Sequence, residues 1–331
     1  MDSLVFAFGA VAPIIFTVAI GYFLKRIGIL PLSVTKPLNK LVFRVLLPAM
    51  LFLNMYNMQS LGEVDPGYIL YSAVMIIAVF LISLPVAMLT TRDGRRRGPI
   101  LQCSFRSNFA LIGIPLAISL FGDEAGALAT VLSAVMIPIF NSLAVIALSI
   151  FHKEGKRVGI GSILLGIIKN PLIISIALGF VAFLIKSFIA SRGVDVSYDP
   201  DDKNLYTAVL TTMEYLSRSA TPLALLVLGA QFEFSAIKSM RREILAGVLM
   251  RNLVVPVLGI ATALLFPAIK PVHYACLVSL FCSPVAVSSA PMSQEMGADA
   301  ELAGQLVVFT TLISGLTVFV AVAILRGCGI F

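Results

Sequence analysis

Two segments of this chain share one pattern, a serine placed eight residues before a proline within apolar sequence. The first runs from Ser107 to Pro115 and the second from Ser283 to Pro291. Proline removes a backbone donor and crowds the preceding turn, so a helix that contains it must bend or break. In lipid, an opened backbone is tolerated only where protein buries it or where it lines a polar cavity. Interrupted helices at matching positions of two halves are typical of the binding site of a secondary transporter.

The composition indicates a membrane protein. Hydrophobic residues make up 59% of the chain, charged residues 12%, and the mean hydropathy is +1.01, whereas soluble domains carry about twice that charged fraction. The net charge of +7 could suggest nucleic acid as a partner, but Lys and Arg form short clusters between apolar runs, as they do in cytoplasmic loops. We therefore expect no nucleic-acid partner. The four cysteines lack metal-like spacing with histidine and are expected to be free thiols.

Apolar stretches long enough to cross about 30 Å of hydrocarbon occur at ten positions, which predicts an all-α membrane protein with ten transmembrane helices. The expected spans are 4–24, 38–58, 67–90, 99–121, 125–150, 161–188, 205–231, 242–266, 272–296 and 301–326.

The basic residues predict the orientation, because cytoplasmic loops carry an excess of Lys and Arg. With the N-terminus outside, fourteen basic residues fall on the inner side and five on the outer side. Both termini are therefore expected outside the cell membrane. The inner set is Lys25, Arg26, Lys36, Lys40, Arg92, Arg95, Arg96, Arg97, Lys153, Lys156, Arg157, Lys238, Arg241 and Arg242, and the outer set is Lys186, Arg192, Lys203, Lys270 and Arg326.

The repeat extends beyond the two proline-containing segments. Pro13 with Gly21 is matched by Pro171 with Gly179, and Arg44 with Pro48 is matched by Arg218 with Pro222. An odd number of spans in each half forces the second half to insert upside down. The expected fold is therefore a 5+5 inverted repeat. Its parts are a first half at 1–151, a cytoplasmic linker at 152–161 and a second half at 162–331.

Several motifs together resemble the auxin efflux carrier family, which includes plant PIN-type carriers and bacterial malonate-transporter-like members. The strongest is Asn108-x-x-x-x-Gly113-x-Pro115, which looks like the family's fourth-helix crossover signature. Ser283-Pro284 through Gly297 is similar to its ninth helix. The resemblance implies a scaffold of helices 1, 2, 6 and 7, a moving core of helices 3–5 and 8–10, and a crossing of broken helices 4 and 9. The linker here is short, as in a compact bacterial-type member.

A crossing of this kind would suit a small organic anion. We expect a half-helix to start near Pro115 and another near Pro291, and helix N-termini carry partial positive charge and unpaired N–H groups. The alternative is that polar side chains merely satisfy the broken backbone. The candidate substrate-binding residues are Asn54, Asn108, Gly113, Pro115, Asn141, Arg251, Ser283, Pro284, Ser288, Ser289 and Pro291.

Five basic residues fall within the predicted spans, where a charge costs about 2.5–3.5 kcal/mol on insertion scales. Arg44, Arg106 and Lys169 are expected to extend to a membrane surface. Arg218 follows Glu214 by four residues, a spacing that predicts an ion pair on one helix face. Arg251 lies deeper and is expected either to assist substrate binding or coupling, or to reach the surface or pair with Glu295.

Other functions remain open at this point. A membrane enzyme is disfavoured, because only His152 and His273 exist and no H-E-x-x-H or G-x-S-x-G pattern occurs. A channel or substrate sensor on the same fold is a stronger alternative. Among carriers we expect a dicarboxylate such as malonate first and an auxin-type monocarboxylate second, with no cofactor. Coupling to a proton or sodium ion and assembly as a homodimer are undecided; Glu214 and Glu295 are the acidic candidates for coupling.

Overall fold

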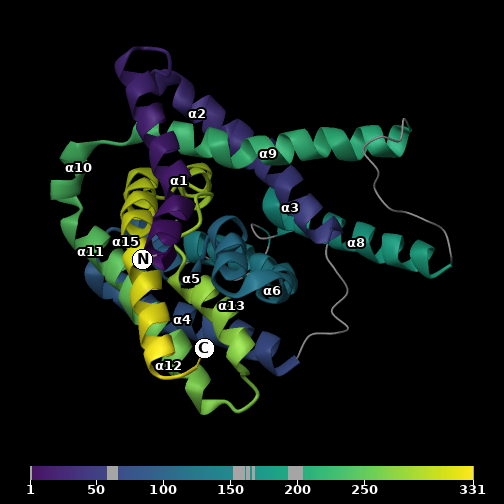
Figure 1. The fold of residues 1–331 in the computed structure, drawn as a ribbon. Coiled ribbons are helices and arrows are strands. Elements are labelled where there is room, and N and C mark those ends of the chain that lie inside the picture. Colours follow the sequence, from purple (N-terminus) through teal and green to yellow (C-terminus); the bar gives the residue numbers. More distant parts are fainter. Residues whose placement is uncertain are drawn as a thin grey trace.

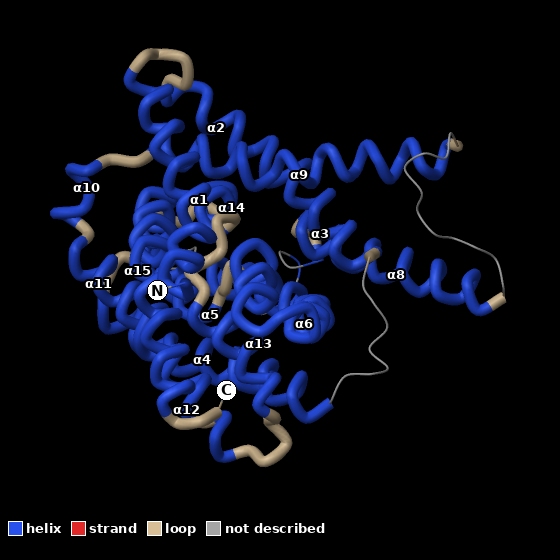
Figure 2. The backbone as a smooth tube through the Cα atoms, in the orientation of Figure 1, coloured by secondary structure: helices blue, strands red, loops and turns tan. Residues whose placement is uncertain are grey.

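The structure is a computed structural model that describes residues 2–57, 66–151, 168–192 and 204–330, with the single positions 161 and 165. All regular elements in this part of the chain are helices (Figure 2), apart from one isolated β-bridge. The prediction of an all-α protein is confirmed for these residues. The predicted linker at 152–161 lies outside them except for its last residue.

The helices are as follows (Figure 1). The first half contains α1 (Asp2–Arg26), α2 (Leu32–Leu41), the π-helix η1 (Val42–Leu46), α3 (Leu47–Tyr56), α4 (Pro66–Thr90), α5 (Gly94–Phe105), the π-helix η3 (Phe109–Gly113) and α6 (Ile114–Ile150). The second half contains α8 (Pro171–Ser191), α9 (Leu205–Gln231), α10 (Phe234–Ser239), α11 (Arg241–Leu249), the π-helix η4 (Met250–Val254), α12 (Val255–Ala261), the short 3₁₀ turn η5 (Ala263–Leu265), α13 (Pro271–Cys282), α14 (Ser289–Glu295) and α15 (Ala300–Gly327).

Six helical stretches among the described residues are long and apolar enough to cross a membrane. They are Leu32–Tyr56, Pro66–Thr90, Gly122–Ile150, Pro171–Ser191, Arg241–Leu265 and Ala300–Gly327. The first begins at Leu32, whereas the sequence predicted a start at residue 38. The predicted start falls just after Pro37, but this proline withholds a donor only from the Ser33 carbonyl, and the helix continues through it.

The two proline-containing segments are interrupted, but not at their prolines. The first break lies at 106–108, between α5 and η3, and the second at 283–288, between α13 and α14. Pro115 stands in the first turn of α6 and Pro291 is the third residue of α14. The expectation that the new half-helices start near the prolines is therefore wrong for the first segment by about two turns. Pro291 fits the first turn of α14, because the N–H that proline lacks has no helical partner there.

Three π-helical segments share a local cause. η1, η3 and η4 are each followed by a proline two residues after they end, namely Pro48, Pro115 and Pro256. The carbonyl that such a proline leaves without its usual donor belongs to the residue four positions earlier, which is the central residue of each π segment. The five-residue hydrogen bonds of these segments are donated by the residue just before each proline: Leu47 donates to Val42, Ile114 to Phe109 and Val255 to Met250. The prolines thus shape these helices without ending them.

Close contacts between backbones hold four of the helices together. α1 packs along α9, and α3 packs along α8 and α9. A side chain at Gly21 would place its Cβ 2.2 Å from the Leu226 carbonyl oxygen, and one at Gly179 would place it 2.5 Å from the Phe52 carbonyl oxygen. Figure 1 shows α8 and the first part of α9 extending beyond the other helices. A second group of helices, α4–α6 and α11–α15, packs mainly within itself.

At one end of the molecule, polar side chains join these two groups. The amide of Gln294 on α14 accepts hydrogen bonds from Asn39 on α2 and from Gln231 at the end of α9, the latter at 2.9 Å. Arg44 and Glu295 lie 3.6 Å apart as an ion pair. The pairing of Glu295 with Arg251, one of the alternatives from sequence, is therefore wrong, because Arg44 is the cation beside this carboxylate.

Candidate functional site

The two breaks contact each other through their backbones. The Asn108 N–H donates to the Pro284 carbonyl at 2.8 Å, and the Ala286 N–H donates to the Arg106 carbonyl at 3.2 Å. Ser107 and Val285 form the antiparallel bridge between them. Two extended strands of chain thus satisfy part of each other's opened backbone, which apolar surroundings require.

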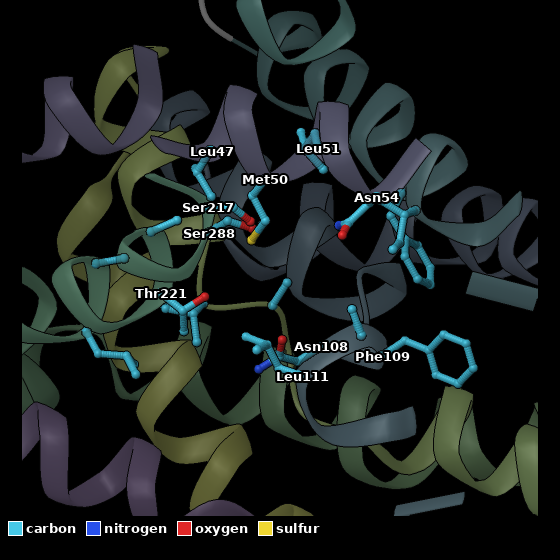
Figure 3. Close-up of a pocket in the computed structure, with 18 of the residues that line it drawn as sticks. Leu47, Met50, Leu51, Asn54, Asn108, Phe109, Leu111, Ser217, Thr221 and Ser288 are labelled. Atoms are coloured by element: carbon cyan, nitrogen blue, oxygen red, sulfur yellow. The ribbon is translucent and has the colours of Figure 1, made fainter. Parts of the chain in front are cut away.

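A cavity of about 670 Å³ lies against this crossing (Figure 3). In the figure, Asn108 and Leu111 face Leu47, Met50 and Leu51 of α3 across it. Its wall also includes Ser217 and Thr221 of α9. Of 27 lining residues, seventeen are apolar. The cavity therefore combines a polar region at the breaks with largely apolar walls, as pockets for small organic molecules do.

Asn108 offers the clearest unused donor at the crossing. The residue is 5% exposed, it lines the cavity, and its side-chain Nδ2 has no hydrogen-bond partner among the described residues. The buried Ser107 hydroxyl likewise has no hydrogen-bond partner among these residues. A buried polar group left unpaired costs about 1–3 kcal/mol. A ligand that accepts hydrogen bonds would remove that cost.

Arg106 is a cation at the same place. It is 3% exposed and lines the cavity, and its Nη2 donates to Asn141 Oδ1 at 2.8 Å and to Ser288 Oγ at 2.9 Å. The expectation that Arg106 extends to a membrane surface is wrong, because the helix stops at Phe105 and leaves this residue at the crossing. Sequence reasoning missed this functional candidate, although its position two residues before Asn108 was a usable signal.

The described lining of the cavity holds no countercharge for Arg106. Among the described residues that line it, none carries a carboxylate side chain. The second lining arginine, Arg218, is largely exposed and bonds Glu214 at 2.5 Å, which confirms the predicted ion pair. Buried charges in proteins are ordinarily paired. The arrangement can therefore stabilise an anion.

The candidate residues from the sequence fall into two groups. Those that line the cavity are Asn54, Asn108, Asn141 and Ser288; those that do not are Gly113, Pro115, Arg251, Ser283, Pro284, Ser289 and Pro291. Asn141 also donates to the Ile137 carbonyl at 2.8 Å, so it serves the backbone and Arg106 together. A Cβ at Gly113 would lie 3.0 Å from the Ser279 carbonyl oxygen, which indicates that this glycine allows η3 to approach α13.

Comparison with known proteins identifies the family. Residues 6–322 match the model of the family described as membrane transport protein. The chain belongs to this family. It is 26% identical to an uncharacterized transporter of Methanocaldococcus jannaschii over 68% of each chain. It is 22% identical to an uncharacterized transporter of Methanothermobacter thermautotrophicus over 92% of this chain and 93% of the other. The predicted resemblance to auxin efflux carrier-like proteins is confirmed, and the chain is an integral membrane protein of a transporter family.

Proposed function

We propose that this protein is a secondary transporter that carries a small carboxylate anion across the cell membrane by alternating access. The observation that carries the proposal is the buried Arg106 guanidinium, which faces a cavity whose described lining holds no carboxylate. The unpaired Asn108 amide lies at the same crossing. A carboxylate would supply the missing charge and accept hydrogen bonds from both residues.

The proposed architecture is ten spans in a 5+5 inverted repeat with both termini outside. Sequence matching pairs Gly21 with Gly179, 158 residues apart, and Phe52 with Leu226, 174 residues apart, which is the offset of Arg44 and Arg218. The close contacts obey the same relation, because Gly21 meets Leu226 while Gly179 meets Phe52. Asn108 and Pro284, joined by a hydrogen bond, also correspond at the offset of 176 residues that relates the two breaks. These coincidences support a two-fold relation that passes through the crossing.

The proposed moving parts follow the two packing groups. Helices α1–α3, α8 and α9 would form the scaffold, and the remaining helices the core. Both contribute to the cavity, the scaffold through residues such as Leu47 and Thr221 and the core through Arg106 and Asn108. Sliding of the core along the scaffold would carry the anion with it. The Asn39–Gln231–Gln294 contacts would have to separate in that step.

The cavity favours a monocarboxylate with an apolar body over malonate. A dicarboxylate would need a second cationic contact, and Arg251, which the sequence suggested for that role, does not line the cavity. Arg218 does line it but is already bonded to Glu214. Burial of an apolar substrate body against these apolar walls stabilises the complex by about 25 cal/mol per Å² of buried area.

A thermal-shift screen of the purified protein against monocarboxylates, dicarboxylates and neutral amides tests the proposal. We expect a monocarboxylate to raise the melting temperature and the matching amide to leave it unchanged. Asn108→Ala should lower the affinity for the carboxylate by about 10-fold or more, since a hydrogen bond to a charged group contributes about 1.5–3 kcal/mol.

The same anion should then exchange across proteoliposome membranes, accelerated by unlabelled anion on the far side. Flux that does not depend on unlabelled anion on the far side of the membrane would indicate a channel instead of a carrier. Stabilisation by neutral or cationic compounds alone would refute an anion site.

A further inference from the structure

Arg251 is the largest fully buried side chain of the described residues that the cavity does not use. Its exposure is 0%, and it lies on the π-helical segment η4. It is absent from the cavity lining. A buried arginine needs several good hydrogen bonds to offset its loss of water, so its partners indicate what it does.

All three partners of its guanidinium are backbone carbonyls beside the breaks. Nε donates to Ser283 at 2.7 Å, Nη2 to Leu280 at 3.0 Å and Nη1 to Ser104 at 3.3 Å. Ser104 lies in the last turn of α5, and Leu280 lies in the last turn of α13. The last four carbonyls of a helix lack helical donors. Arg251 thus joins the ends of two broken helices, Phe105 and Cys282, that are 177 residues apart in the chain.

The charge of Arg251 opposes the field of these two ends. Each helix C-terminus carries the equivalent of about half a negative elementary charge, and both ends point toward the crossing where we place the anion. Without a nearby cation, they would repel it. One full positive charge, bonded to both, offsets the two partial charges and leaves the N-terminal end of η3 and α6 and the charge of Arg106 to set the potential.

We propose that Arg251 is a positioning residue: it clamps the ends of α5 and α13 together and keeps the potential of the cavity positive without touching the substrate. This inference rests on the proposed anion site. It makes Arg251 a determinant of charge preference, acting from behind the crossing.

The potential of the cavity can be measured without knowing the substrate. Ala110 lines the cavity at an exposed position, so Ala110→Cys places a reactive thiol there. Of the native cysteines only Cys328 is exposed, and Cys328→Ser removes it. The probes are two methanethiosulfonate reagents of similar size, one anionic and one cationic. Mass spectrometry of the peptide around position 110 scores the introduced thiol alone.

With Arg251 intact, we expect the anionic reagent to react faster than the cationic one, relative to their rates with free thiol. Arg251→Met should lower that ratio by about 10-fold or more, because removing a buried charge acts on the two reagents in opposite senses. Arg251→Lys should keep most of the ratio while losing some stability, since lysine retains the charge but not the planar fork. A purely structural role would alter both rates together and leave the ratio unchanged.

Tyr71→Phe is the matched control for lost stability. Its hydroxyl makes buried contacts to Gly259 and Thr262, away from the breaks, so the control should lower the melting temperature without changing the ratio. An unchanged ratio in Arg251→Met, or a collapsed ratio in Arg251→Lys at wild-type stability, would overturn the inference. If Arg251→Met does not fold, Arg251→Gln takes its place, because glutamine removes the charge but keeps a hydrogen-bond donor. A lowered ratio in Arg251→Gln supports the inference, and an unchanged ratio overturns it. An intact protein that already favours the cationic reagent would instead refute the anion site itself.

Discussion

Two buried arginines near the crossing differ in how many of their N–H donors remain available to a ligand. Arg251 gives its three kinds of N–H to backbone carbonyls that need donors. Arg106 bonds neutral side chains, Asn141 and Ser288, and lies close to the Met292 sulfur. Sulfur is a weak acceptor. Arg106 is therefore the less satisfied cation, and it is the one that lines the cavity.

Replacing Arg106 should separate binding from stability. We expect Arg106→Met to lower the affinity for a carboxylate by about 10-fold to 100-fold, because a charged hydrogen bond is lost. Without bound anion, the melting temperature of Arg106→Met should be no lower than that of the wild type. An uncompensated buried charge costs several kcal/mol, and the substitution removes it. Isothermal titration and thermal unfolding without anion measure the two effects. Arg106→Lys, which keeps the charge, should bind better than Arg106→Met. A large loss of apo stability would assign Arg106 a structural role.

The sequence could predict that an amide and serines gather at the breaks, but it misplaced Arg106 and could not identify the partners of Arg251. Counting residues along an assumed continuous helix puts Arg106 about two turns from a membrane surface. A helix that stops at Phe105 removes the basis of that count. Arg251 was recognised as deep, yet only coordinates place its guanidinium on the carbonyls behind the crossing.

At the scale of elements, composition and length placed two helices closely, and local hydrogen bonding decided how others deviate. The helix Leu205–Gln231 coincides with its predicted span, and Ala300–Gly327 with its own within one residue at each end. The π segments were not predicted, although each precedes a proline at a fixed spacing. The interruption at 106–108 depends on pairing with residues 284–286, a long-range contact that a local pattern does not contain.

Pro115 should therefore control the geometry of the site through η3. In Pro115→Ala the new N–H can pair with the Leu111 carbonyl, so the π turn should relax to an α turn and rotate Asn108 relative to α6. We expect anion affinity to fall about 10-fold while the helix becomes no less stable, since proline inside a helix costs about 3 kcal/mol relative to alanine. Isothermal titration and thermal unfolding measure these effects.

Pro85→Ala is the control, because Pro85 lies within α4 and outside the cavity. It should leave affinity unchanged. Wild-type binding by Pro115→Ala would show that the π turn does not position the site.

At the scale of the whole molecule, the proposed repeat predicts that equivalent contacts contribute equally to stability. The sequence indicated the repeat through isolated pairs of residues, but it could not say which helix each glycine meets. Gly21 on α1 and Gly179 on α8 are matched in sequence, and each lies against a carbonyl of the opposite half. Neither has room for a methyl group unless the two helices separate.

Gly21→Ala and Gly179→Ala should consequently destabilise the protein by similar amounts, about 1–3 kcal/mol each, as overpacking does. Reversible unfolding in detergent measures the loss. Gly315→Ala is the control, because a Cβ there would meet nothing within 4 Å; it should be neutral or slightly stabilising, since alanine favours the helix by about 1 kcal/mol. Because the two contacts would be related by the two-fold relation through Asn108 and Pro284, a penalty confined to one of them would contradict an equivalent role for the two halves. Similar losses of stability at both would indicate that the contact of α1 with α9 and the contact of α3 with α8 contribute equally. A rigid scaffold would depend on both contacts.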